Sequence, residues 1–209
     1  MKIENKLFLA GAMLAAFMLP AVAQESTATT PVDPAVKPKT GPIQNRKENQ
    51  QQRIGQGVEN GSLTAGETKT IEKQEAGLNK EEKAMRAEDG GKLTAADRAK
   101  LNNQQNHLSK EIYRDKHNGR VQNTDPKSEV GKRQREQQER IGQGIASGQV
   151  TAGEAAKVEG NAARINREVH NERAANGGKL TAGEKAQVNR QQNRNSRQIY
   201  HAKHNKRTR

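Results

Sequence analysis

An ungapped internal duplication constrains this 209-residue chain more than any other feature of its sequence. Residues 53–118 align with residues 140–205 at an offset of 87, and 33 of the 66 aligned positions are identical. Both copies begin with Arg-Ile-Gly-Gln-Gly and end with Ile-Tyr-x-x-Lys-His-Asn. Self-similarity at a fixed offset is typical of repeated supersecondary units, so the sequence predicts two equivalent units in tandem.

Each copy contains two corner motifs of the form Gly-x-Leu-Thr-Ala-x-Glu, with Val for Leu or Asp for Glu at single instances. The glycine can adopt the left-handed backbone conformation that ends a helix. A threonine followed three residues later by a carboxylate forms a capping box that begins the next helix. The expected capping pairs are Thr64 with Glu67, Thr94 with Asp97, Thr151 with Glu154, and Thr181 with Glu184.

Apolar residues recur at helical spacing, and no segment alternates with a period of two. Ile71, Leu78 and Met85 are seven residues apart, which gives the narrow stripe of a coiled-coil seam. The stripe is thinner in the second copy, where Asn195 stands at the position of Leu108. The predicted fold is all-α, a tandem duplication of a three-helix unit forming hairpins or a bundle. The expected helices span 44–59, 65–88, 95–118, 129–146, 152–175 and 182–206.

The N-terminus has the layout of a secretory signal peptide. Lys2 and Lys6 precede an apolar run over 7–19, and Ala21-Val-Ala23 supplies the small residues of a cleavage site. The run is short for a permanent membrane span. We therefore expect cleavage after residue 23, a periplasmic or secreted protein, and no transmembrane segment after cleavage.

After residue 23, differences in composition divide the chain into a spacer, two repeats, a linker and a tail. Four prolines within 24–43 predict a disordered spacer. The first helical repeat is expected at 44–118, a disordered linker at 119–130, the second repeat at 131–205, and a disordered basic tail at 206–209. After residue 23, only 26 of 186 residues are large apolar or aromatic. This scarcity predicts marginal stability, with stabilisation by self-association or by a partner.

Neither the motifs nor the composition indicates catalysis. The chain has no Gly-x-Ser-x-Gly motif, no phosphate loop and no paired acids in an apolar setting. His201 and His204 could face one metal ion from a helix, but the chain has no Cys and the nearest carboxylate of that helix, Glu184, is distant. We expect a binding protein that is not an enzyme and uses no cofactor and no metal.

Positive charge is concentrated in the second copy. Residues 44–118 carry 14 basic and 12 acidic side chains, whereas residues 131–209 carry 17 and 7. Such a surface suits lipopolysaccharide phosphates, acidic glycans or extracellular DNA. A solvated face that complements the dipole of the last helix explains the same charges. The sequence shows no interleaved aromatics for base stacking, so sequence-specific nucleic-acid recognition is not expected. The candidate polyanion-binding residues are Arg190, Arg194, Arg197, Lys203, Lys206, Arg207 and Arg209.

Three resemblances follow from these motifs. The chain after residue 23 resembles uncharacterised exported bacterial proteins built from Gln-, Arg- and Asn-rich helical repeats ending in Ile-Tyr-x-x-Lys-His-Asn. The corners are similar to the short C-terminal (SHOCT) helical hairpin, over about 30 residues. They also resemble the Leu-Thr-x-x-Gln motif of Spy-type periplasmic chaperones, with Glu or Asp here replacing Gln. This last resemblance implies an alternative function, a chaperone-like envelope-stress protein that binds unfolded client proteins.

Overall fold

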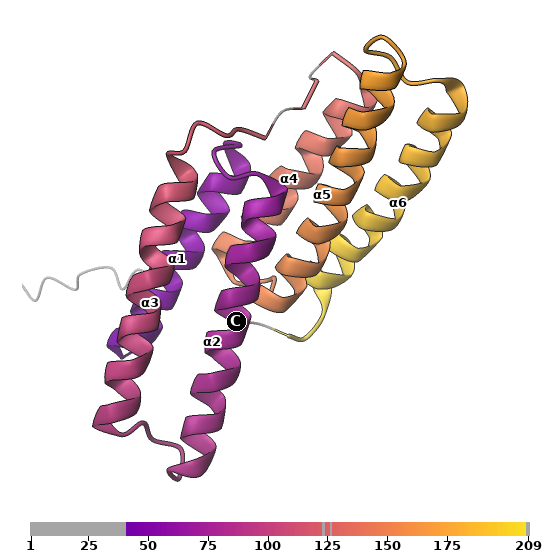
Figure 1. Ribbon diagram of the computed structural model, residues 1–209. Coiled ribbons are helices and arrows are strands. Elements are labelled where there is room, and N and C mark those ends of the chain that lie inside the picture. The colour runs from indigo at the N-terminus through magenta and orange to yellow at the C-terminus, as the bar shows by residue number, and fades with distance from the viewer. Residues whose placement is uncertain (1–40, 123, 126, 208–209) are drawn as a thin grey trace, which may run out of the picture. The chain divides into compact units, whose positions relative to one another are not determined.

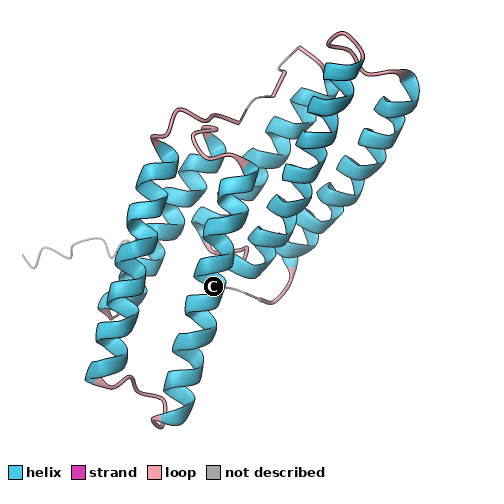
Figure 2. Cartoon of the chain, in the orientation of Figure 1, coloured by secondary structure: helices cyan, strands magenta, loops and turns pink. Residues whose placement is uncertain are grey.

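The computed structural model describes residues 41–122, 124–125 and 127–207. This part of the chain contains six α-helices and no strand, so the predicted all-α class is confirmed (Figures 1 and 2). The predicted signal peptide, residues 24–40 of the predicted spacer, and Arg209 lie outside the described residues. None of the helices described here is both long enough and apolar enough to cross a bilayer. The helices are α1 (Pro42–Glu59), α2 (Ala65–Glu88), α3 (Ala95–Lys116), α4 (Glu129–Ser147), α5 (Ala152–Ala175) and α6 (Ala182–His204).

The first helix begins two residues earlier than expected. Pro42 occupies the first turn of α1, where a missing N–H leaves no hydrogen bond unmade. Ile43 is buried and packs with Leu93 and Leu101. Residues 42 and 43 therefore belong to the first helix and not to the predicted spacer. Burial of Ile43 favours a helix that begins before residue 44.

The predicted linker, 119–130, overlaps the predicted helix, 129–146, and in the structure the helix begins at residue 129. Glu129 and Val130 belong to α4, whose first turn is capped by Ser128, and Val130 is buried. In the described part of the linker, the Gln122 N–H donates to the Gly61 carbonyl at 2.9 Å. The Gln122 Oε1 in turn accepts from the Ala65 N–H at 2.8 Å. Gln122, within the predicted linker, therefore caps the start of α2.

All four corner motifs form capping boxes. In each, the threonine Oγ1 accepts from the N–H three residues later, and the carboxylate accepts from the threonine N–H. Gly61 and Gly148, which precede two of the corners, both have a φ of 74°. These local bonds fix where α2, α3, α5 and α6 begin.

Helices from the two copies pack directly against each other. α1 lies against α4, and α2 lies against α5, while α3 covers α1 and α2, and α6 covers α4 and α5. Figure 1 shows the α2–α3 hairpin and the corresponding α5–α6 hairpin. One apolar cluster draws on both copies; its members include Ile54, Val58, Ile71, Ile112, Ile141, Ile145, Val158 and Ile199.

The glycines of the Arg-Ile-Gly-Gln-Gly motif allow this close packing. A Cβ on Gly55 would lie 2.7 Å from the Gly142 carbonyl oxygen of α4, closer than real Cβ atoms approach. A Cβ on Gly57 would lie 2.7 Å from the Leu63 side chain. The motif therefore permits a backbone-to-backbone crossing of α1 and α4 and the burial of the corner leucine.

Buried glutamines supply part of the core that the apolar residues do not fill. Gln50 Nε2 donates to the Gln105 carbonyl at 2.8 Å, and Gln137 Nε2 donates to the Gln192 carbonyl at 2.8 Å. All four residues are buried. Hydrogen bonding lowers the cost of burying these amides, although among the described residues the Oε1 atoms of Gln50, Gln105 and Gln192 have no partner.

Candidate functional site

The candidate surface is the solvent side of α6. Arg190, Arg194 and Arg197 are exposed, and His201 continues the same stripe. The opposite side of α6 is buried and carries Val188, Gln192, Asn195, Ile199 and Ala202. The spacing of the arginines by four and three residues places them on one face, and burial of the other face directs that face to solvent.

The three guanidinium groups have no carboxylate close to them. Within residues 41–122, 124–125 and 127–207, no ion pair within 4.0 Å includes Arg190, Arg194 or Arg197. Their charges therefore add to one another over the surface of α6. An anionic ligand would not need to displace a bound carboxylate to reach them.

The remaining predicted residues do not all join this stripe. Lys203 is half-buried, and its stem packs near Gly144. The Arg207 Nη1 lies 3.9 Å from the Glu154 Oε1, at the start of α5. Lys206 is exposed, and Arg209 lies outside the described residues. The structure thus places the three α6 arginines together. Arg207 is separate from them, because it lies beside the carboxylate of the Thr151–Glu154 capping box.

Two arginines of α4, which the sequence reasoning missed, flank the stripe. Arg133 donates from Nη1 to the Asn189 Oδ1 at 3.2 Å and from Nη2 to the Asn193 side chain. The Arg140 Nη2 donates to the Ser196 Oγ at 3.2 Å. Arg133 and Arg140 are seven residues apart, so the sequence could place them on one face of α4. Only the packing of α4 against α6 shows that this face lies beside the arginine stripe. We use the name α6 basic face for Arg190, Arg194 and Arg197 together with these two flanking residues.

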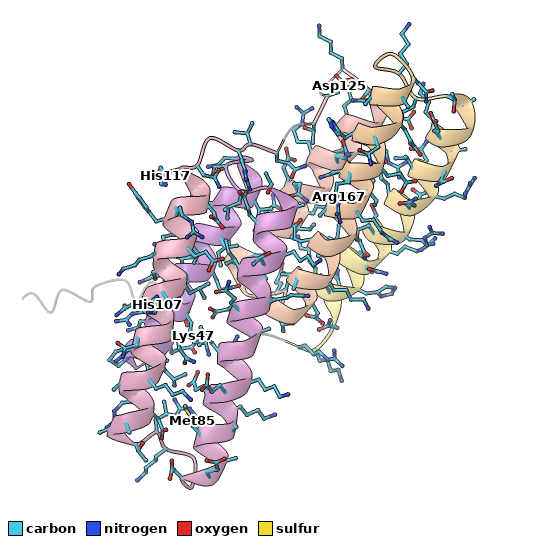
Figure 3. The ribbon with its side chains drawn as sticks, viewed as in Figure 1. Lys47, Met85, His107, His117, Asp125 and Arg167 are labelled. Atoms are coloured by element: carbon cyan, nitrogen blue, oxygen red, sulfur yellow. The ribbon has the colours of Figure 1, made fainter. Side chains whose placement is uncertain are left out.

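The corresponding face of the first copy carries less positive charge. Asn103, His107 and Lys110 of α3 stand at the positions of Arg190, Arg194 and Arg197, and all three are exposed; Figure 3 shows His107 on α3. The two copies therefore share this exposed face, while its strong charge belongs to the second copy.

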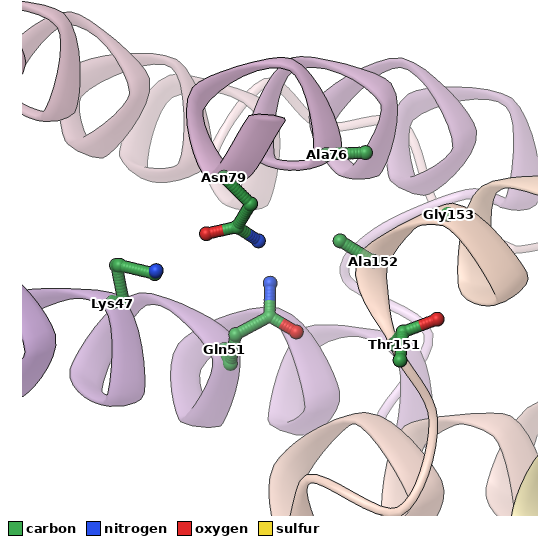
Figure 4. A pocket seen from close by; sticks show the side chains of 7 residues that line it. All are labelled: Lys47, Gln51, Ala76, Asn79, Thr151, Ala152 and Gly153. Carbon is green, nitrogen blue, oxygen red and sulfur yellow. The ribbon is translucent and has the colours of Figure 1, made fainter. Parts of the chain in front are cut away.

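A cavity of about 340 Å³ lies where the two copies meet (Figure 4). Figure 4 shows Lys47 and Gln51 of α1 facing Asn79 of α2, with the first residues of α5 on a third side. The Lys47 Nζ is paired with the Glu82 Oε2 at 2.9 Å, and the Thr151 Oγ1 belongs to a capping box. The amine and hydroxyl of this cavity are therefore both engaged in structural contacts.

One buried carboxyl has a strongly shifted pKa. Burial raises the pKa of Glu159 to about 8, although Gln138 Nε2 donates to its Oε2 at 3.0 Å. Glu159 belongs to α5 and is fully buried. Because the side chain is closed off from solvent, its protonation bears on the stability of the fold.

The described histidines do not form a metal centre. Across the described part of the chain, no group of three His, Cys, Asp or Glu side chains is placed to hold a metal ion. His201 and His204 instead contact the Tyr200 ring, edge-on at 5.9 Å and stacked at 4.1 Å between ring centroids.

No protein family, curated protein or solved structure matches this chain.

Proposed function

We propose that this protein is an exported, non-enzymatic binding protein that contacts anionic polymers through the α6 basic face. The observation that carries the proposal is the row of three exposed arginines, which have no carboxylate partner among the described residues. Arg190, Arg194 and Arg197 each offer a planar group with five donors, which suits phosphate and sulfate oxygens. Neutralising each anion releases counterions, which favours binding at low salt.

The two flanking arginines support the same proposal. Arg133 and Arg140 are held toward α6 by hydrogen bonds to Asn189 and Ser196, so their positive charge lies beside the stripe. Glu136, between them on α4, offsets part of this charge. The three arginines span about two turns of one helix, a length that suits a polymer better than a small molecule.

The chaperone-like alternative receives less support from the surface. A holdase needs apolar surface to hold unfolded clients, and in the described part of the chain the exposed large hydrophobic residues are Tyr113, Val121 and Tyr200. They do not form the broad apolar patch expected of a client-binding surface. Suppression of client aggregation at substoichiometric protein would favour the alternative over polymer binding.

The test is a triple substitution with a charge-matched control. Arg190, Arg194 and Arg197 are changed together to Gln, and in the control Lys73, Lys80 and Lys83 of α2 are changed to Gln. The control lysines are also exposed and form no ion pair within the described part of the chain. Each variant replaces three cationic residues, so both lose the same net charge. Binding to heparin and to DNA is measured over a range of salt concentrations.

The α6 variant should bind both polymers at least about tenfold more weakly, and its salt slope should fall by about 2 to 3. The α2 variant should lose little. Equal losses in the two variants would reduce the effect to net charge and contradict a defined surface. Export is tested separately, by mass spectrometry of the cell envelope and medium, where the N-terminal peptide should begin at Gln24.

A further inference from the structure

Each copy ends in an exposed tyrosine stacked on a histidine. The Tyr113 and His117 ring centroids lie 4.3 Å apart with an interplanar angle of 29°. Tyr200 and His204 repeat this arrangement at 4.1 Å and 22°. Tyr113 and Tyr200 are 64% and 58% exposed as whole residues, and the histidine covers one face of each ring. Figure 3 shows His117 at the end of α3.

Hydrogen bonds hold both pairs in place. The His204 Nδ1 lies 2.7 Å from the Tyr200 carbonyl oxygen, and the His117 Nδ1 lies 2.6 Å from the Tyr113 carbonyl oxygen. A carbonyl only accepts, so Nδ1 is the protonated nitrogen in each ring. This bond satisfies a carbonyl at the end of the helix, which accounts for the histidine. It does not account for a tyrosine that buries less than half of its surface.

The two tyrosines differ in the charge around them. Arg197 and Lys203 lie one turn before and one turn after Tyr200, where helical spacing makes them neighbours of the ring. Tyr113 has Lys110 and Lys116 at the same offsets. The helix before it differs, because Asn103 and His107 stand where the second copy has Arg190 and Arg194. Of the two described tyrosines, Tyr200 is therefore the one whose exposed ring follows a row of arginines.

We propose that Tyr200 is a base-stacking platform and that the polymer bound by the α6 basic face is single-stranded nucleic acid. Phosphates would lie along Arg190, Arg194 and Arg197, and a base would stack on the exposed ring at the end of the row. From Arg190 to Tyr200, α6 rises about 15 Å, enough for a few nucleotides. Cationic tracks ending on aromatic rings bind single strands with little sequence preference.

This chemistry distinguishes a single strand from the other polyanions. Acidic glycans and lipopolysaccharide phosphates carry negative charge but no aromatic ring. A duplex keeps its bases stacked on one another and inside the helix, so a platform on the protein surface adds little. The inference rests on the proposed function and identifies the class of polymer that the α6 basic face binds.

The experiment compares an oligothymidylate of about 20 nucleotides with heparin. Tyr200→Ala should weaken oligothymidylate binding about tenfold or more and leave heparin binding unchanged within about twofold. Tyr113→Ala, at the equivalent position of the first copy, should change neither affinity. Tyr200→Phe keeps the ring and should retain oligothymidylate binding, which separates stacking from loss of the hydroxyl.

Intrinsic fluorescence gives a readout at the ring itself. The chain has two tyrosines and no tryptophan, so Tyr113→Phe leaves Tyr200 as the single strong emitter. Oligothymidylate should quench this emission with the same midpoint as the binding curve, and heparin should not.

The outcomes separate the two proposals. A wild-type protein that binds neither polymer would overturn both the proposed function and this inference. A second outcome is that heparin binds and Tyr200→Ala either changes neither affinity or weakens both equally. In that case the polyanion-binding surface is supported and the stacking platform is wrong. Equal losses in Tyr113→Ala and Tyr200→Ala would also overturn the platform at Tyr200.

Discussion

Asn195 of α6 occupies the position that Leu108 occupies in α3, 87 residues earlier, and both side chains are 1% exposed. Leu108 belongs to the apolar cluster shared by the two copies. Among the described residues, neither the Oδ1 nor the Nδ2 of Asn195 has a hydrogen-bond partner. The second copy therefore buries an unsatisfied amide where the first copy buries a leucine.

Changing Asn195 to Leu should stabilise the protein. The substitution removes two buried polar atoms without partners and restores the apolar contact of the first copy, so the free energy of unfolding should rise by about 1–3 kcal/mol. Urea unfolding followed by circular dichroism measures this change. Leu108→Asn is the matched reverse substitution and should lower stability by about 3 kcal/mol or more. A loss of stability in Asn195→Leu would show that the amide has partners in solution.

Stability should fall as the pH rises from about 4.5 to about 8, because of Glu159. Burial raises its pKa from 4.5 to about 8. Within this window the folded protein keeps the proton, whereas the unfolded chain has lost it. The folded state therefore binds more protons, and raising the pH favours unfolding. This contribution is lost as the pH rises through the folded pKa, opposite to the usual behaviour of a carboxylate.

Glu159→Gln removes the titrating group and should flatten this part of the stability profile, with a gain of a few kcal/mol near pH 8. The Gln138 Oε1 has no partner in the described structure, so this amide can rotate and accept from the new one. Thermal melts at several pH values provide the measurement. Glu139→Gln, at an exposed position of α4, is the control and should leave the slope unchanged. An unchanged slope in Glu159→Gln as well would rule out Glu159 as its cause.

Gly55→Ala should destabilise the packing of α1 against α4. The added Cβ would lie 2.7 Å from the Gly142 carbonyl oxygen, and a backbone atom cannot move aside as a flexible side chain can. The expected loss is at least about 2 kcal/mol in the free energy of unfolding. Gly77→Ala is the control, because a Cβ there meets nothing within 4 Å; it should gain about 1 kcal/mol from helix propensity. Similar effects of the two substitutions would mean that the helices do not cross at Gly55.

The helix boundaries could be predicted to within two residues because their signals are local. A threonine, an acid three residues later and a preceding glycine determine each corner without reference to the rest of the fold. The pairing of α1 with α4 and of α2 with α5 could not be predicted in this way. Residues such as Gln50 and Gln51 resemble solvent-facing side chains in the sequence, yet they are buried, and the Nε2 of each donates to a residue of another helix.

The candidate surface, too, could be predicted from the sequence only where local spacing decides it. Helical periodicity alone places Arg190, Arg194 and Arg197 on one face. That Arg207 approaches Glu154 depends on a contact between residues 53 positions apart, and the exposure of Tyr200 depends on what packs against α6. Neither can be deduced from spacing within one helix.

The four capping boxes should differ in their contribution to stability. Glu67 accepts from the Thr64 N–H at 3.0 Å and also from the Asn118 Nδ2 at 2.7 Å, which ties the end of the first copy to the start of α2. Asp97, at an exposed corner, accepts from the Thr94 N–H at 2.9 Å and from the Thr94 hydroxyl at 2.6 Å.

Thr64→Ala should therefore lower the free energy of unfolding by about 2 kcal/mol, and Thr94→Ala by about 0.5–1 kcal/mol. Urea unfolding of both variants under one set of conditions gives the comparison. Asn118→Ala should reproduce part of the Thr64→Ala loss, and the double variant should lose less than the sum of the two, because both residues bond the same carboxylate. If the two losses add exactly in the double variant, the Asn118 contact contributes independently of the capping box. If Thr64→Ala and Thr94→Ala lose the same stability, burial of the corner adds nothing to the cap.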